Sequence, residues 1–320
     1  MKLNRFASIP VCGVLTLMGF VYYITIFIFI EDWVGLATSA GTLNALIFTL
    51  MASLSLFSFV ASVLTDPGYV PPSAAPDVEA AAVLDPKTHK DSSQLRQCEK
   101  CSRYKPPRAH HCRVCRVCVL RMDHHCLWIN NCVGHWNYKA FIVLIFYATA
   151  ASIYSTVVIM NSSSHKDWDF AGVLPFKIFY IISGTMMAGL SITLSTLLGW
   201  HIYLITRNMT TIEYHEGTRA AWLAKKSGQI YRHPFNINIY ANISSVPLSL
   251  SLARCKPHIA PTVYILILLS ECSILAPAPL RRFGSEHAKM VLSHCSQLPE
   301  RWNELSYLTS ELIQFTGSVR

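Results

Sequence analysis

The residues of this chain that are best suited to chemistry are cysteines and histidines crowded into one short stretch. Seven cysteines and five histidines lie within the 38 residues from Cys98 to His135. A structural zinc ion takes four Cys or His ligands, often presented in Cys-x2-Cys steps, so two ions need eight ligands. Six thiolates come from Cys98, Cys101, Cys112, Cys115, Cys118 and Cys132. Two histidines then complete two sites, but spacing alone does not choose between His110 and His111 for the first site, nor assign ligands to ions.

One cysteine is left over by this count, and Cys126 stands out because it ends the run Asp123-His124-His125-Cys126. A neighbouring imidazole lowers the pKa of a thiol from its usual value near 8.5 and so raises the fraction of reactive thiolate. A cysteine, a base and an acid that orients the base form a nucleophilic Cys-His-Asp arrangement, with His124 as base and Asp123 as its partner. The alternative is a purely structural pair of zinc sites that docks a protein partner.

The composition favours a membrane protein. The chain has 320 residues, of which 52% are hydrophobic and only 14% are charged, whereas soluble domains carry about 25% charged residues. The formal net charge is +9, and in a membrane protein such a basic balance marks the cytoplasmic face. The eleven cysteines are odd in number, and most are clustered among histidines. This pattern indicates metal binding in a reducing compartment rather than a disulfide framework.

Four long apolar stretches reach the roughly 20 residues that a helix needs to span a bilayer. They cover residues 10–30, 42–64, 140–160 and 176–206. We therefore expect an all-α polytopic membrane protein of four transmembrane helices, with the cysteine-rich segment between the second and the third. A fifth apolar stretch, residues 259–280, is interrupted by three prolines and a glutamate. It predicts a weak fifth span, an interfacial segment or an unstructured tail.

The loops predict the orientation of these helices. The loop from Glu31 to Gly41 has two acids and no Lys or Arg, whereas residues 65–139 carry eleven Lys or Arg, and five more follow the fourth span before residue 233. The positive-inside rule therefore places the cysteine-rich segment and the start of the tail in the cytosol.

The pattern divides the chain into six regions. We expect spans one and two with a short luminal loop in residues 1–64, a cytosolic linker in 65–97, a zinc domain in 98–139, spans three and four in 140–206, a cytosolic tail in 207–246 and a divergent tail in 247–320. Within the zinc domain, Lys105-Pro106-Pro107-Arg108 precludes a long helix. Short strands and loops held mainly by metal are expected instead.

A nucleophilic thiol at the cytosolic face of four membrane helices suits a substrate with a lipid tail. Basic residues near it, chiefly Lys105, Arg108 and Arg121, suit the phosphates of a carrier such as coenzyme A, and the alternative is a basic surface that faces the lipid headgroups. Trp128, two residues after Cys126, either lines an acyl entrance or anchors at the membrane interface.

Taken together, these motifs resemble the cysteine-rich domain of the Asp-His-His-Cys family of protein S-acyltransferases. The resemblance is carried by Cys98-x2-Cys101, Pro107-Arg-x2-His111-Cys112-x2-Cys115-x2-Cys118, Asp123-His-His-Cys126-x-Trp128 and Asn131-Cys-Val-Gly-x2-Asn137. Two flanking motifs agree, Asp66-Pro67-Gly68 after the second span and Thr210-Thr-Ile-Glu213 after the fourth. The resemblance covers about residues 1–246, and Tyr231-Arg-His-Pro-Phe-Asn236 is most similar to plant members.

The resemblance implies a protein palmitoyltransferase in which Cys126 takes the acyl group from acyl-CoA and passes it to a cysteine of a membrane-associated protein. It implies His124 as general base, Asp123 as its orienting partner, Thr211 in contact with Asp123, and Asn242 as a brace for the tail. It assigns one zinc to Cys98, Cys101, His111 and Cys118, and the other to Cys112, Cys115, His125 and Cys132.

The remaining expectations concern location and alternatives. We expect a multi-pass protein with its N-terminus and zinc domain in the cytosol, in the Golgi or another endomembrane, with the plasma membrane as the alternative. We expect no nucleic-acid partner, because the aromatic residues near the cluster lie at membrane-proximal positions. The main alternative function is an inactive, zinc-stabilised membrane adaptor, since the sequence departs from the family after Val246.

Overall fold

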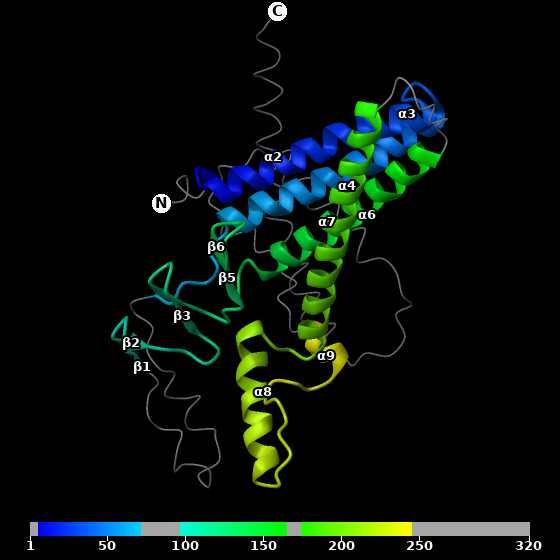
Figure 1. Cartoon of the computed structure of the whole chain (residues 1–320). Helices are drawn as coiled ribbons and strands as arrows, with labels where there is room; N and C mark the ends of the chain where they lie inside the picture. Colours follow the sequence, from blue (N-terminus) through cyan, green and yellow to red (C-terminus); the bar gives the residue numbers. More distant parts are fainter. Residues whose placement is uncertain (1–5, 72–96, 165–173, 245–320) are drawn as a thin grey trace, which may run out of the picture. The chain divides into compact units, whose positions relative to one another are not determined.

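The structure is a computed structural model that describes residues 6–71, 97–164 and 174–244 (Figure 1). Its elements are α2 (Ile9–Ile24), the π-helix η1 (Thr25–Ile30), α3 (Glu31–Val34), α4 (Ser39–Leu64), β1 (Gln97–Cys98), β2 (Arg103–Tyr104), β3 (His110–Cys112), β4 (Val117–Val119), β5 (His124–Cys126), β6 (Asn131–Val133), α6 (Tyr138–Ser164), α7 (Leu174–Thr206), α8 (Thr211–Lys226) and α9 (Ile239–Ser244). The fifth apolar stretch and the divergent tail lie outside the described residues.

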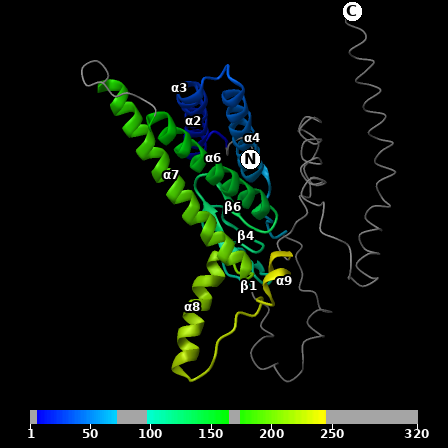
Figure 2. The same ribbon diagram turned by 90° about the vertical axis from the view of Figure 1, so that its right-hand side faces the viewer.

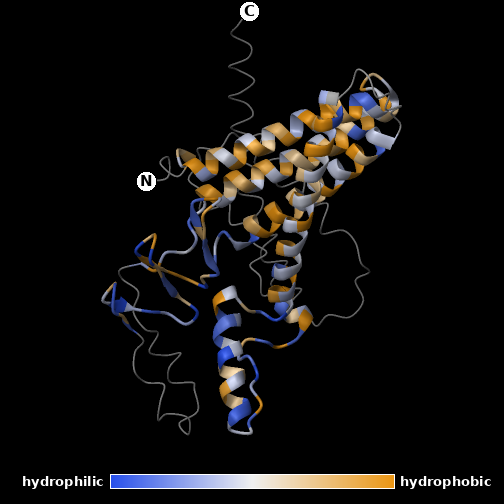
Figure 3. Ribbon diagram, in the orientation of Figure 1, coloured by the Kyte–Doolittle hydropathy of each residue, from blue (hydrophilic) through white to orange (hydrophobic). Residues whose placement is uncertain are grey.

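Within the described part of the chain, four helices are long and apolar enough to cross a membrane, as the sequence predicts. They cover Ile9–Val34, Ser39–Leu64, Tyr138–Ser164 and Pro175–Thr206. The hydrophobic colour is concentrated on these helices, while the hairpins between the second and third are largely hydrophilic (Figure 3). Helix α6 packs against both α4 and α7, so the third span lies at the centre of the helix contacts (Figure 2).

The loop expected from Glu31 to Gly41 is shorter than predicted. The first helix continues as α3 to Val34 and ends at Gly35, whose φ of 73° is in the left-handed region that favours glycine. Thr38 then caps α4 by accepting a hydrogen bond from the Gly41 amide. The acids at the end of the first span therefore belong to its last helical turns, because helical hydrogen bonding does not stop where the apolar run stops.

The cysteine-rich segment forms three separate antiparallel hairpins, β1–β2, β3–β4 and β5–β6. Each strand has only two or three residues, which confirms the expectation of short strands and loops. Two-stranded hairpins of this size are marginal by themselves. They therefore need stabilisation from outside the strands, such as contacts with the helices or a bound metal.

The third hairpin is fixed directly to the ends of two membrane helices. The side-chain amide of Asn131 donates to the carbonyl oxygens of Ser62, Val63 and Thr65 at the end of α4. Helical carbonyls at this end have no partner within the helix. Just before α6, the Asn137 amide donates to the Cys132 carbonyl at 2.7 Å. The hairpin is thereby held between the second and third spans.

The Asp66-Pro67-Gly68 motif packs the chain that leaves α4 against the hairpins. The Asp66 carboxylate accepts from the amides of Gly68 and Tyr69 and closes a tight turn. A Cβ on Gly134 would lie 2.6 Å from the Pro67 carbonyl oxygen. Glycine is therefore required at this crossing of the two segments.

Helices α8 and α9 follow the fourth span. Thr210 and Glu213 form a complete capping box at the start of α8, and this box is a sequence signal for a helix start within the Thr-Thr-x-Glu motif. Asn242 of α9 is fully buried and donates to the Thr206 carbonyl at the end of α7. The tail is therefore tied to the fourth span up to Ser244.

Candidate functional site

Two sets of four Cys and His side chains converge in the hairpins, each with ligand atoms within 4.8 Å of one another. One set comprises Cys98, Cys101, His111 and Cys118, and the other comprises Cys112, Cys115, His125 and Cys132. Of the two histidines that spacing left open, the structure brings His111 into the first set.

The geometry of both sets fits a tetrahedral zinc ion. Bond lengths of about 2.3 Å to sulfur and 2.0 Å to nitrogen require ligand atoms separated by roughly 3.5–3.8 Å. The distances from His111 Nδ1 to the sulfurs of Cys98 and Cys101 are 3.5 and 3.2 Å. In the second set, Cys115 Sγ is 3.5 Å from both His125 Nδ1 and Cys132 Sγ.

The charges of these thiols also indicate a cation. Burial and the neighbouring thiols of Cys98 and Cys101 raise the pKa of Cys118 to about 12. In the second set, the hydrogen bond with Cys132 is the main cause that lowers the pKa of Cys115 to about 4, while Cys115 and burial raise the pKa of Cys132. Several thiolates can share such a space only if a metal ion neutralises them.

Strand alternation directs His125 to one side of β5 and its neighbours His124 and Cys126 to the other. Cross-strand pairing sets His125 opposite Cys132 and Cys126 opposite Asn131, and directly opposed residues share one face of a hairpin. Successive residues point to opposite faces, so His125 and Cys132 face the second metal set. His124 and Cys126, two residues apart, share the other face.

On that face, Asp123, His124 and Cys126 form a connected group. His124 Nδ1 donates to Asp123 Oδ2 over 2.7 Å, a length typical of a charge-assisted hydrogen bond. This bond leaves Nε2 as the nitrogen available to Cys126, and the imidazole acts to lower the pKa of that thiol. Asp123 is fully buried and Cys126 is 8% exposed.

The environment favours the thiolate of Cys126 and the protonated form of His124. Burial raises the pKa of the thiol, but hydrogen bonds from His124 and from the amides of Ile129 and Trp128 outweigh it and lower the pKa. Burial lowers the pKa of the imidazole, but Asp123 and Cys126 outweigh it and raise the pKa of His124 to about 9. An ion pair of this kind activates a cysteine nucleophile.

The side chain of Cys126 also borders the apolar interior of the helices. Cys126 belongs to a buried cluster with Phe59 of α4 and with Phe141 and Ile145 of α6. A hydrocarbon chain attached to its sulfur would therefore have apolar side chains next to it.

Asp123 is held by the segment after the fourth span as well as by His124. Thr211 donates its backbone amide to Asp123 Oδ1 at 2.9 Å and its hydroxyl to Oδ2 at 2.8 Å. Burial raises the pKa of this carboxyl, but the hydrogen bond and charge of His124 outweigh it, so the pKa is lowered and Asp123 is ionised.

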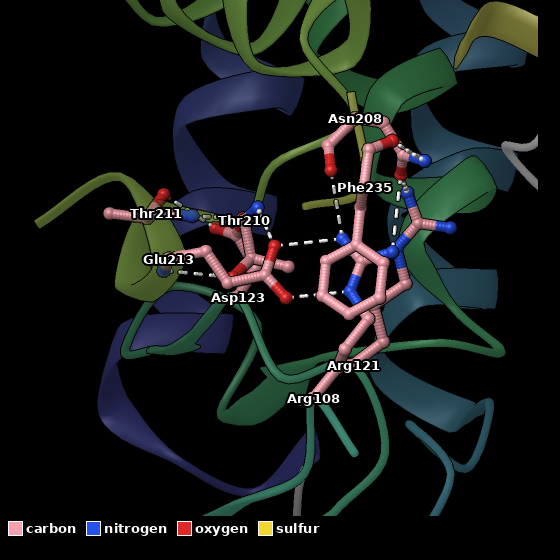
Figure 4. A network of polar contacts seen from close by, with 8 residues as sticks. All are labelled: Arg108, Arg121, Asp123, Asn208, Thr210, Thr211, Glu213 and Phe235. Carbon is pink, nitrogen blue, oxygen red and sulfur yellow. Dashed lines mark hydrogen bonds and ion pairs between the residues drawn. The ribbon is translucent and has the colours of Figure 1, made fainter. Parts of the chain in front are cut away.

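A second polar network, which we call the clamp, joins the hairpins to the start of α8 (Figure 4). It consists of Arg108, Arg121, Asn208, Glu213 and Phe235. Arg108 binds both oxygens of Glu213 at 2.6 and 2.7 Å. It also donates to the side chain and carbonyl of Asn208 and lies 4.3 Å from the centre of the Phe235 ring. Arg121 donates to the same Asn208 side chain at 2.8 Å.

Three members of the clamp have left-handed backbone conformations, with φ of 62° at Arg108, 43° at Arg121 and 49° at Asn208. Such conformations are unfavourable for residues with a Cβ and persist where the surrounding contacts enforce them. The clamp therefore fixes the backbone as well as the side chains.

The residues predicted to bind coenzyme A lie in different environments. Arg108 and Arg121 are partly buried in the clamp, whereas Lys105 lies outside it. Trp128 lies in the turn between β5 and β6 and is 63% exposed. Its amide, rather than its ring, contributes to the group around Cys126.

Sequence reasoning missed Asn208, Phe235, Tyr138 and His201 as residues of this region. A short-range signal exists for one of them. His201 is an ionisable residue within an apolar span, and such residues are commonly functional. Asn208 and Phe235 reach the clamp only through tertiary contacts, so spacing does not indicate them.

These features define a class: a membrane protein whose metal-binding hairpins present a buried thiol beside a His–Asp pair. Comparison with known proteins agrees. Residues 91–218 match the sequence model of the DHHC palmitoyltransferase family. The chain belongs to this family, which confirms the enzyme class that the motifs predict.

Similar proteins match far beyond the hairpins. "Probable protein S-acyltransferase 15" of Arabidopsis thaliana is 60% identical over 229 residues, which cover 72% of this chain and 89% of the relative. "Probable protein S-acyltransferase 16" of the same plant is 48% identical over 241 residues, 75% of this chain and 84% of the relative. "Palmitoyltransferase ZDHHC3" of Homo sapiens is 30% identical over 206 residues, 61% of this chain and 67% of the relative.

Proposed function

We propose that this acyltransferase moves a fatty acyl group, palmitate in the first instance, from acyl-CoA to protein cysteines through a thioester on Cys126. The observation that carries the proposal is the connected group Asp123–His124–Cys126 at the edge of an apolar helix cluster. A reactive thiol beside apolar side chains matches a substrate that is a thioester with a hydrocarbon tail. The comparisons give the inactive adaptor no support.

In the first step, the Cys126 thiolate attacks the thioester carbonyl of acyl-CoA. The bond from the carbonyl carbon to the CoA sulfur breaks, and the CoA thiolate leaves with the proton of the His124 imidazolium. In the second step, the substrate thiol gives its proton to His124 and attacks the carbonyl, which releases the Cys126 thiolate. Each step exchanges one thioester for another, so catalysis consists mainly of positioning and thiol activation.

We assign zinc to both metal sets, in a structural role. Cys98, Cys101, His111 and Cys118 would hold one ion, and Cys112, Cys115, His125 and Cys132 the other. Bound zinc would neutralise the clustered thiolates and fix the hairpins that carry Cys126. We further propose Lys105 as a ligand of the CoA phosphates. The binding of CoA phosphates by Arg108 and Arg121 stays a prediction. The hydrogen bonds that they donate to Asn208 and Glu213 support a role in the clamp.

The hairpins, and with them the N-terminus, would face the cytosol, where acyl-CoA and substrate cysteines are available. The excess of Lys and Arg in residues 65–139 supports this orientation. A Golgi or other endomembrane location is part of the proposal. Protease protection of an N-terminal tag in sealed vesicles would contradict the orientation. Labelling of the tagged protein at the plasma membrane would contradict the location.

The direct test is acyl labelling of the purified full-length chain with radiolabelled palmitoyl-CoA. Wild-type protein is expected to gain hydroxylamine-sensitive label, and Cys126→Ser is expected to lose it while keeping its bound zinc. Cys12→Ser is the matched control, because Cys12 is an exposed thiol outside the site. Full hydroxylamine-sensitive label on Cys126→Ser would disprove the mechanism.

A further inference from the structure

A second histidine, His201 of α7, lies beside the His–Asp pair. It is 1% exposed. One of its ring nitrogens, one ligand atom of His124 and one oxygen of Asp123 lie within 4.8 Å of one another. The fourth span thus contributes a polar side chain to a site that otherwise belongs to the hairpins and the start of α8.

The orientation of His201 is fixed from the third span. Its Nδ1 lies 3.2 Å from the hydroxyl of Tyr138 on α6, and Tyr138 is itself buried. The Phe141 ring packs edge-on against His201, with ring centres 5.2 Å apart. Polar and aromatic contacts together allow the imidazole little rotation.

The same side chains surround His124. Phe141 packs edge-on against the His124 ring with centres 5.4 Å apart, and the His201 ring lies 6.1 Å away at 41°. Asp123 holds Nδ1 of His124. The base is therefore restrained at its Nδ1 edge by Asp123 and against its ring by Phe141 and His201, while Nε2 stays directed to Cys126.

A role in packing alone does not account for an imidazole at this position. An apolar side chain would fill the space between α6 and α7 without burying ring nitrogens in a membrane span, where ionisable residues are costly and usually functional. One ring nitrogen also lies within 4.8 Å of an oxygen of the Asp123 carboxylate. The arrangement is thus suited to a group that acts on the Asp123–His124 pair.

We propose that His201, oriented by Tyr138, is a positioning residue that holds His124 and Asp123 in line with Cys126. This inference rests on the proposed roles of those three residues. The fourth span is then part of the active site, and side chains of α6 and α7 determine the orientation of the His124 imidazole on β5. Displacement of a catalytic group by about 1 Å can cost on the order of a hundredfold in rate.

The test compares His201→Phe, which keeps a ring but removes both nitrogens, with His201→Asn, whose amide nitrogen can replace Nδ1 as a partner of Tyr138. The measurements are the single-turnover rate of Cys126 acylation at saturating palmitoyl-CoA, the KM for palmitoyl-CoA, and the rate at which iodoacetamide alkylates Cys126. His201→Phe is expected to lower both rates on the order of tenfold or more with KM unchanged, and His201→Asn to restore much of the loss. His215→Phe on α8 is the matched control, because His215 is exposed and outside the site.

Tyr138→Phe provides a second test, since it removes only one hydroxyl. It is expected to slow acylation, and to slow it no further when combined with His201→Phe, because both changes break the same link. Wild-type rates in His201→Phe would overturn the inference. If His201→Phe does not fold, wild-type rates in Tyr138→Phe would overturn it. Label that persists on Cys126→Ser would instead overturn the proposed function, so the two failures are distinguishable.

Discussion

His124, His125 and Cys126 follow one another in sequence, yet they serve two different sites. The two-residue period of β5 directs His125 toward Cys115 and Cys132 and directs its neighbours to the opposite face. One strand of three residues thus contributes a proposed metal ligand on one side and the proposed nucleophile with its base on the other. Any shift of register by one residue would exchange the two histidines.

At the same scale, Thr211 supplies a hydroxyl that can be removed without changing the shape of the side chain. Thr211→Val should lower the single-turnover acylation rate about tenfold, because a hydrogen bond to a buried carboxylate is worth about 1.5–3 kcal/mol. Thr211→Ser keeps the hydroxyl and should retain most of the rate. Equal rates for the Val and Ser variants would show that the Oγ1–Asp123 contact is dispensable.

At the scale of elements, the hairpins depend on metal because each strand has at most three residues. Elemental analysis of purified protein should find two zinc ions per chain, matching the two ligand sets. Cys101→Ala should bind about one ion fewer and lose acylation, since apo sites of this kind do not fold. Cys12→Ala should bind the full amount, and a Cys101→Ala variant with unchanged zinc would contradict the assignment.

The clamp is the element-scale link between the hairpins and α8. Glu213 is 7% exposed. Glu213→Gln removes the charge that pairs with Arg108, and breaking a charge-assisted pair at this depth should cost about 2 kcal/mol. The melting temperature should then fall by about 4–8 °C. Glu216→Gln is the matched control, because Glu216 is exposed on the same helix.

The Glu213 prediction has a defined dependence on pH. Burial raises the pKa of this carboxyl, but the hydrogen bond and charge of Arg108 outweigh it, so the pKa is lowered in the folded protein. A carboxyl whose pKa is lowered by folding stabilises the fold fully at pH values above its pKa in the unfolded chain, about 4.3. That stabilisation is lost as the pH falls through the lower pKa of the folded protein. The difference in melting temperature between wild type and Glu213→Gln should therefore stay constant from about pH 8 to 5 and shrink below about pH 4. A difference that shrinks near neutral pH would contradict it.

At the scale of the whole molecule, the site is assembled from segments far apart in the chain. Asp123 meets Thr211, and Arg108 meets Glu213 and Phe235. Asn242 ties α9 to the end of α7. All these contacts involve residues before Ser244.

Truncation tests this assembly. A chain that ends at Val246 should keep its acyl label, because it retains the contacts of the site and the clamp that the described residues make. A chain that ends at Gly228 should lose most of it, because it lacks the Phe235 stacking on Arg108 and the Asn242 brace. Acyl-CoA labelling of both beside the full-length protein provides the measurement. Equal label on both truncated chains would show that the segment after α8 is not required.

The spans and the presence of two metal sites were predictable because their signals are local, whereas the division of ligands between the two sites came only from the family resemblance. A run of apolar residues is sufficient for a membrane helix, and Cys-x2-Cys steps bring ligands together over a few residues. The helical extension through Glu31–Val34 and the start of α8 were not predicted. The first depends on where Gly35 ends the helix, and the second has a signal in the Thr210–Glu213 capping box.

By itself, the sequence determined four membrane helices, a Cys/His domain between the second and third, and a spare thiol in an Asp-His-His-Cys run. Tertiary structure decided that Arg108 and Arg121 join Asn208 in a clamp, that Thr211 holds Asp123, and that His201 reaches the site from the fourth span. The physical reason is range. Composition and short spacings record interactions between neighbours, whereas these contacts join residues some 60 to 105 positions apart and exist only once the helices and hairpins have packed.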